Sequence, residues 1–116
     1  MMGPEVGRVL FYSKPMDMRK SIRGLSLFVS AQLLKEPTSG ELFVFYNRRR
    51  SKIKILYWQT NGYCLFYKSL QGGVFVLPKG DGEEIELSRI QLRWLLEGLD
   101  INTTKGHKEK RYRVHY

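Results

Sequence analysis

The fold of this 116-residue chain is decided by one stretch, LFVFYNRRRSKIKILYWQTNG, which covers residues 42–62. Residues 42–46 are a continuous run of apolar, mostly aromatic side chains, long enough for one strand. Residues 52–58 begin with a period-two alternation and predict a second strand, and the polar, arginine-rich residues 47–51 predict the turn between the two. Asn61 and Gly62 both tolerate the positive φ angles of a type I′ turn, so a tight hairpin should follow.

The predicted hairpin also fixes a strand register. With Asn61 and Gly62 in the turn, cross-strand partners sum to 123, so that Trp58 lies opposite Leu65. Both faces of the hairpin are then largely apolar near the turn, whereas an antiparallel sheet with one wet face would alternate more cleanly. We therefore expect both faces to be covered. The two predicted helices would cover one face, and a second copy of the chain is the candidate cover of the other.

Upstream of the hairpin the sequence predicts one strand and one helix. Residues 9–12 are a short β-prone run. The Asp17 carboxylate can accept hydrogen bonds from the free amides of a first helical turn, which makes this residue the predicted N-cap. Apolar residues then recur at helical spacing over residues 18–35. Pro37 ends the helix, because it pushes the preceding residue out of the α region.

Downstream of the hairpin the sequence predicts a strand, an acidic loop and a second helix. Residues 74–77 have the composition of a strand, and residues 79–86 form the acidic loop. Ser88 and Gln91 match a capping box at the start of the helix. Gly98 then matches the C′ position, where a left-handed residue ends a helix.

Together these elements predict an α+β fold. We expect a single domain over residues 1–104, built from an antiparallel β-meander of about four to five strands and flanked by helices at 18–35 and 88–98. Residues 105–116 are a basic C-terminal tail, which is either a free arm or an added edge strand.

The charge of the chain is distributed unevenly. The formal charge is +9, from 20 Lys plus Arg and 11 Asp plus Glu. Residues 42–80 hold seven of the cations and no acid at all, whereas residues 81–100 carry a net charge of −4. A basic block of this kind favours a polyanionic partner. The alternative is a solvated surface whose charges only aid solubility.

Several classes of protein are disfavoured by the composition. No apolar run approaches the roughly 18 residues of a membrane helix, and the first residues do not resemble a secretory signal. The single cysteine, Cys64, excludes an intramolecular disulfide framework. We therefore expect a soluble protein of a reducing compartment, with no membrane partner.

Groups that could carry out catalysis or bind a metal are poorly placed. The acids of residues 81–86 lie in a predicted loop and none lies on the predicted central strands, which disfavours a metal–carboxylate site. Cys64 lies beside a hairpin turn among apolar neighbours and fits a small core residue better than a nucleophile. We expect no catalytic residue, no metal site and no cofactor.

The central cations are better suited to nucleic acid. Three arginines at a hairpin turn can reach phosphates without disturbing the sheet. Lysines that share a strand face with Trp58 would also suit single-stranded nucleic acid, although the aromatic residues are more simply core. The predicted phosphate-contacting residues are Arg48, Arg49, Arg50, Lys52, Lys54 and Lys68, with Arg19, Lys20 and Arg23 as a second patch.

Four segments together resemble a known family. They are DMRK at residues 17–20, GELFVF at 40–45, GYCLFYK at 62–68 and LLEGLD at 95–100. In this order they resemble the TnpB-like accessory protein that the second open reading frame of insertion sequence 66 elements encodes. The resemblance covers about residues 8–100. Gln59 and Leu77 depart from the pattern, in which Asp and Trp are usual at these places.

The resemblance implies a bacterial mobile-element protein that works beside a larger transposase, which carries the strand-transfer chemistry. Our leading hypothesis is a non-enzymatic accessory factor in the cytoplasm, associated with the nucleoid, that binds DNA through the basic hairpin, most simply the duplex ends of the element. The alternative is a subunit that binds the transposase or another element-encoded accessory protein through exposed aromatic residues, without touching DNA.

Overall fold

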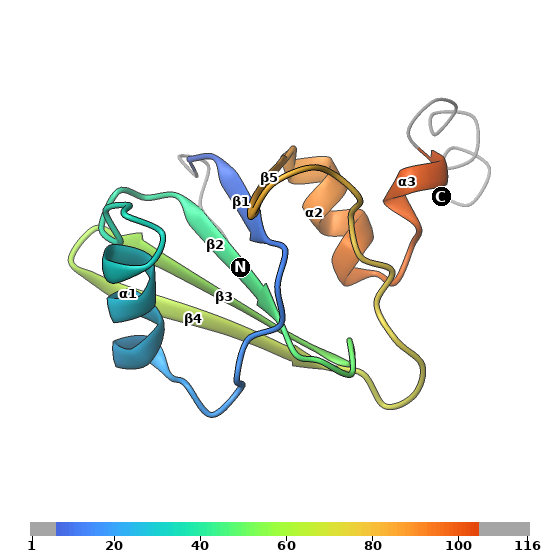
Figure 1. Ribbon diagram of the computed structural model, residues 1–116, viewed down its shortest axis with the longest axis horizontal. Helices are drawn as coiled ribbons and strands as arrows, with labels where there is room; N and C mark the ends of the chain where they lie inside the picture. The colour runs from blue at the N-terminus through green and yellow to red at the C-terminus, as the bar shows by residue number, and fades with distance from the viewer. Residues whose placement is uncertain (1–6, 105–116) are drawn as a thin grey trace.

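The computed structural model describes residues 7–104 of the chain. A five-stranded sheet forms its centre, with a helix against each face (Figure 1). The strands are β1 (Val9–Tyr12), β2 (Leu42–Tyr46), β3 (Lys52–Gln59), β4 (Gly62–Ser69) and β5 (Glu84–Leu87). The helices are α1 (Ile22–Ala31), α2 (Arg89–Leu96) and α3 (Ile101–Thr104). The predicted basic tail and its edge strand, residues 105–116, lie outside the described residues.

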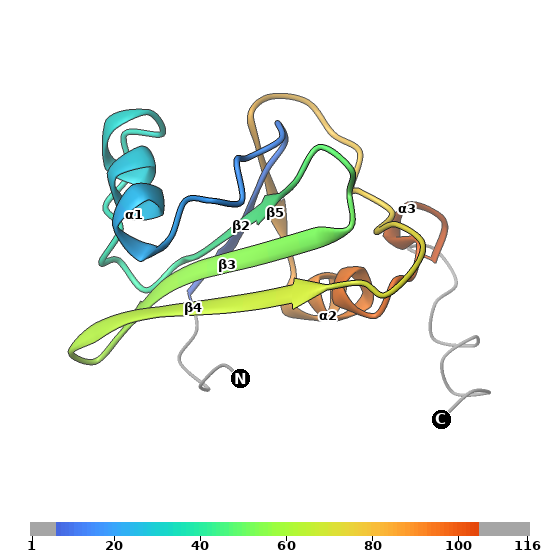
Figure 2. The same ribbon diagram turned by 90° about the horizontal axis from the view of Figure 1, so that it is seen from below.

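The sheet is mixed, with the strand order β4-β3-β2-β1-β5 (Figure 2). The strands β2, β3 and β4 form the antiparallel meander that the sequence predicts. The α+β class is therefore confirmed, but the purely antiparallel pairing is wrong. β1 lies parallel to β2, with Val9 opposite Leu42, because the chain returns to the sheet through the α1 crossover.

Residues 74–77 do not form the predicted strand. The Phe75 N–H donates to the Arg50 carbonyl at 2.7 Å, and the Leu77 carbonyl accepts from the Asn102 side chain at 3.0 Å. The backbone groups of this segment are therefore bonded to a turn and to a short helix rather than to a strand. Phe75 is fully buried, so the apolar composition of the segment reflects core packing.

The fifth strand lies instead where the sequence predicts an acidic loop. β5 pairs antiparallel with β1, and its residues alternate between Glu84 or Glu86 and the apolar Ile85 or Leu87. Leu87 is buried in the core, and Ile85 packs against it. The alternation is a strand signal that the glutamate content of the segment masks.

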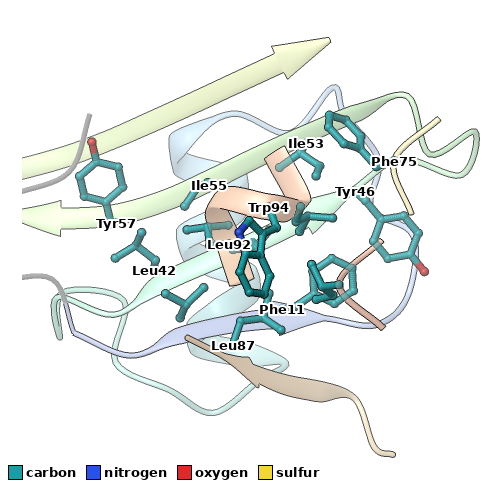
Figure 3. Close-up of a cluster of buried hydrophobic side chains, with 14 residues drawn as sticks. Phe11, Leu42, Tyr46, Ile53, Ile55, Tyr57, Phe75, Leu87, Leu92 and Trp94 are labelled. Atoms are coloured by element: carbon teal, nitrogen blue, oxygen red, sulfur yellow. The ribbon is translucent and has the colours of Figure 1, made fainter. Parts of the chain in front are cut away.

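Each face of the sheet is packed by a different helix. On one face, α1 contributes Leu25 and Val29 to a cluster with alternate residues of β2 and β3. On the other face, α2 contributes Leu92 and Trp94, which lie over Ile53 and its neighbours in Figure 3. The expectation that both helices cover one face is therefore wrong. Odd- and even-numbered residues of the central strands, which point to opposite faces of the sheet, are both apolar because each face is covered by its own helix.

The β3–β4 hairpin turns at Thr60 and Asn61, one residue earlier than predicted. Trp58 consequently pairs with Tyr63 rather than with Leu65. Thr60 adopts the positive φ of 59° that the prediction assigns to the Asn-Gly pair. Because the register differs by two residues, every side chain keeps its predicted face of the sheet.

The α2 boundaries follow the predicted signals. The Ser88 hydroxyl accepts from the Gln91 N–H at 3.1 Å, and the Gln91 side chain accepts from the Ser88 N–H at 2.9 Å, so the capping box is confirmed. Gly98 follows the helix at φ 82°, as a C′ residue should. The start of α1 is different: its N-cap is Ser21, and the predicted cap, Asp17, lies in a turn before the helix.

Candidate nucleic-acid interface

The β2–β3 connection is a short turn that exposes Arg48, Arg49 and Arg50. The Arg50 N–H donates to the Asn47 carbonyl at 2.9 Å, which closes the turn. The Asn47 side-chain oxygen accepts from the N–H groups of Ser51 and Lys52, both at 2.9 Å. These bonds, all made by one asparagine, fix the backbone that carries the arginines.

Arg50 adopts a backbone conformation that normally favours glycine. Its φ is 61°, in the left-handed region that glycine adopts more readily than residues with a side chain. A side chain in this conformation costs about 1–2 kcal/mol. The Phe75 N–H, which donates to the Arg50 carbonyl at 2.7 Å, holds the strained residue in place from the core side. Backbone strain of this kind is concentrated at functional sites.

The charge of the turn is not neutralised within the described residues. Neither the three arginines nor Lys52 belongs to any of the ion pairs found between residues 7 and 104. Their field reaches the neighbouring strand: burial raises the pKa of Tyr46, and the positive charges of Arg50 and Arg48 act in the opposite direction. The turn is therefore a concentrated patch of positive charge on a fixed backbone.

The second predicted patch lies on the segment that leads from β1 to the start of α1. The Met16 N–H donates to the carbonyl of Tyr46, the last residue of β2, at 2.7 Å, which holds the segment before α1 beside the start of the arginine turn (Figure 1). Lys20 and Arg23 are exposed further along the chain, where α1 begins. Arg19 is exposed as well, but its guanidinium is paired with Asp17 at 2.7 Å.

The Asp17–Arg19 pair gives a testable titration. Hydrogen bonds from the Arg19 guanidinium and backbone N–H lower the pKa of Asp17 from 3.8 to about 2. We expect Arg19→Gln to raise this pKa toward 3.8, as measured by NMR titration of the Asp17 carboxyl carbon. Because the folded-state pKa is below the unfolded value, any stabilisation is complete above the unfolded pKa and is lost as the pH falls through about 2.

Lys20→Gln is the matched control for this titration. It removes a neighbouring positive charge, which is the weakest of the influences on Asp17, but removes no hydrogen bond to the carboxylate. The pKa of Asp17 should therefore move much less than in Arg19→Gln. Equal shifts in the two variants would show that the hydrogen bonds do not cause the low pKa.

Two of the predicted phosphate-contacting lysines donate hydrogen bonds to backbone carbonyls. Lys54 is only 8% exposed, and its ammonium donates to the carbonyls of Met18 and Lys20 at 2.7 and 2.8 Å. The Lys68 ammonium donates to the Leu96 carbonyl at 2.8 Å. Both charges are therefore used to join β3 or β4 to a helix or its leading segment. Of the predicted residues, those whose charged groups make no hydrogen bond or ion pair within residues 7–104 are Arg48, Arg49, Arg50, Lys52, Lys20 and Arg23.

Sequence reasoning did not single out Asn47, the residue that organises the turn. The available signal is an asparagine between a strand and a polar tripeptide, a position where its side chain can bond to the following backbone.

The described residues contain neither a metal-ligand cluster nor a membrane-spanning helix. Within residues 7–104, no three His, Cys, Asp or Glu side chains gather as metal ligands would. No helix in that range has the length and apolar character needed to cross a membrane.

Comparison with known proteins gives one family and two relatives. The family model described as IS66 Orf2 like protein matches residues 7–106. Uncharacterized protein y4jC of Sinorhizobium fredii is 32% identical over 112 residues, which cover 96% of each chain. Uncharacterized protein y4hO of the same organism is 42% identical over 84 residues, which cover 72% of this chain and 73% of the relative. No solved structure matches significantly.

Proposed function

Because this chain belongs to the IS66 Orf2-like family, the transposition accessory proteins of insertion elements, we propose that it binds the DNA on which transposition acts. In this function the chain catalyses no step itself, and a separate transposase carries out strand transfer. The contacts would be made by the arginine turn, with Lys52 beside it and with Lys20 and Arg23 as a second group.

One observation carries this proposal: three exposed arginines, which have no acidic partner among residues 7–104, lie on a turn whose backbone is held on both sides. A guanidinium forms paired hydrogen bonds with a phosphate, and a fixed backbone reduces the entropy lost when the contact forms. The arginine at position 50 is strained where a glycine would not be, so the turn keeps its third cation at a cost in stability.

The burial of the aromatic residues of β2 and of Tyr57 favours duplex over single-stranded DNA. Recognition of single strands depends on aromatic rings that are free to stack on bases. Phe43, Phe45 and Tyr57 are instead buried beneath the two helices, and Trp58 packs edge-on against Tyr63 at 5.0 Å. Phosphate contacts would then carry the binding, and such contacts position a protein without reading sequence.

A salt titration tests the proposal. If about five phosphates are neutralised, the logarithm of the association constant should fall with the logarithm of salt concentration with a slope near −4.5. The measurement is fluorescence anisotropy of a labelled duplex of about 20 base pairs, between about 50 and 200 mM salt. Binding that is absent at the lowest salt, or a slope near zero, would contradict DNA binding through this patch.

Arg50→Gly should change stability and binding in opposite directions. Relief of the left-handed strain, less the greater entropy of glycine in the unfolded chain, should raise the free energy of unfolding by about 0.5–1 kcal/mol. Loss of one phosphate contact should weaken duplex binding about fivefold at about 0.15 M salt. Urea unfolding and anisotropy measure the two quantities on the same sample.

Arg50→Lys is the control for this substitution, since it keeps both the charge and the strain. Its stability and affinity should stay close to those of the unsubstituted chain. If Arg50→Gly is more stable but binds DNA just as well, Arg50 does not contact the duplex.

The alternative function, binding the transposase or another accessory protein, would need an exposed apolar surface, and the helices cover the aromatic residues of β2. The region around α1 offers one. Leu27 is 55% exposed and Leu34 is 83% exposed, and Leu34 adopts a positive φ of 56°. Co-precipitation of the element's transposase with a Leu27→Ser and Leu34→Ser double variant separates the two functions. Loss of capture with intact DNA binding would favour the alternative.

A further inference from the structure

We propose that two copies of this chain associate through β4, joining their sheets into one. The strands β4 and β5 are the two outer strands of the sheet. Such strands can pair with another chain through unused backbone groups, and proteins usually protect them with charges, proline, bulges or short length. The two outer strands differ sharply in this protection.

β5 is a protected edge. It has only four residues, and two of them are glutamates. Glu84 is paired with Lys35 at 3.4 Å and Glu86 with Arg8 at 3.6 Å. A strand arriving at this edge would meet charged side chains over half of its length.

β4 lacks this protection. It has eight residues, contains no proline and carries one charge, on Lys68. That ammonium is turned toward the Leu96 carbonyl, so it does not guard the edge. None of the eight residues is buried, although residues 53–57 of the neighbouring β3 all are. The side chains of β4 therefore present apolar and aromatic surface that one more strand would cover.

The hydrogen-bond pattern identifies which backbone groups are available. The Leu70 N–H, just after β4, donates inward to the Ser51 carbonyl at 2.8 Å. Backbone groups alternate in direction along an antiparallel strand, so even-numbered residues of β4 point toward β3. The N–H and C=O groups of Tyr63, Leu65 and Tyr67 consequently point outward.

A second copy satisfies this pattern without a charge clash. In an antiparallel pairing about a two-fold axis, Leu65 lies opposite Leu65 of the second copy and Tyr63 lies opposite its Tyr67. The outward N–H and C=O groups of the two strands then bond to one another. The faces that α1 covers in each copy lie on the same side of the joined sheet, and aromatic side chains form cross-strand pairs. A register shifted by one residue on each strand would instead place Cys64 opposite the charged Lys68. The basic tail is a poorer occupant, because β4 has no acidic side chain to match it.

Opposite charges at position 65 test both the dimer and its register. We expect the unsubstituted chain to scatter light as twice its 13.7 kDa at about 100 μM. Leu65→Lys and Leu65→Glu should each dimerise at least about tenfold more weakly, because like charges then face each other across the axis. An equimolar mixture of the two variants should restore the dimer. A monomeric unsubstituted chain, or a mixture that stays monomeric, would overturn the proposal.

Hydrogen exchange measured by NMR provides a readout that needs no substitution. In the dimer, the outward amides of Leu65 and Tyr67 should be protected at high protein concentration and should lose this protection on dilution. The inward amides of Cys64 and Phe66 should stay protected throughout, because they bond to β3. Outward amides that exchange rapidly at all concentrations would overturn the proposal even if the position-65 variants failed to fold. The arginine turn lies outside this interface, so dimerisation and DNA binding can fail independently.

Discussion

Replacing Arg48, Arg49 and Arg50 together by serine should lower the affinity for duplex DNA about 100-fold at about 0.15 M salt. Each phosphate contact that is lost removes about 0.9 from the magnitude of the salt slope. The slope should therefore change from about −4.5 to about −1.8. The arginines make no ion pair within the described residues, so the loss should appear in binding and not in folding.

The matched control removes the same formal charge from another part of the surface. Lys79, Arg89 and Arg93 are exposed and lie in or near α2, away from the β2–β3 turn. Serine at these three positions should weaken binding only modestly, because net charge alone contributes little beyond a Debye length of about 8–10 Å. Equal losses of affinity in the two triple variants would mean that DNA binding depends on the total charge of the protein and not on contacts made by the arginine turn.

Lys54→Met should lower the free energy of unfolding by about 2–4 kcal/mol. Methionine matches the length of the lysine stem but leaves the carbonyls of Met18 and Lys20 without their donor. A buried polar group left unsatisfied costs about 1–3 kcal/mol. The substitution also removes the ammonium that lies 5.1 Å from the centre of the Tyr67 ring. Urea unfolding at neutral pH measures the effect.

Lys52→Met is the control, two residues away on the same face of β3. Its lysine forms no ion pair in the described part of the chain, so stability should change by less than about 0.5 kcal/mol. The DNA result should be the reverse: about fivefold weaker binding for Lys52→Met and little change for folded Lys54→Met. If Lys54→Met is as stable as Lys52→Met, the two carbonyl contacts do not hold the segment before α1.

Local signals in the sequence predicted the meander and α2 well. The capping box of Ser88 and Gln91 depends on a few neighbouring residues, and such signals survive in the folded chain. The side of the sheet on which each helix packs could not be predicted in this way. Apolar residues at both parities of β2 and β3 show that both faces are covered, but not by what. The parallel position of β1 likewise depends on the route of the whole crossover.

The candidate site was predicted in part for the same reason. Three arginines between two strands are evident in the sequence. That Lys54 is buried is not evident, because it depends on backbone carbonyls of Met18 and Lys20, more than thirty residues away. A lysine between Ile53 and Ile55 has the same local sequence pattern whether its ammonium binds a phosphate or donates to a backbone carbonyl. Only the packing of the segment before α1 distinguishes these roles.

The arginine turn makes the charge of the surface uneven. Glu83, Glu84 and Glu86, in or beside β5, are each paired with a cation. The three arginines between β2 and β3 belong to none of the ion pairs of the described residues. In the field of a polyanion such a molecule experiences a torque as well as an attraction, so it would turn the arginines forward before contact. Association should then be fast at low ionic strength and slow steeply as salt screens the field. The turn would thus orient the encounter before any contact forms.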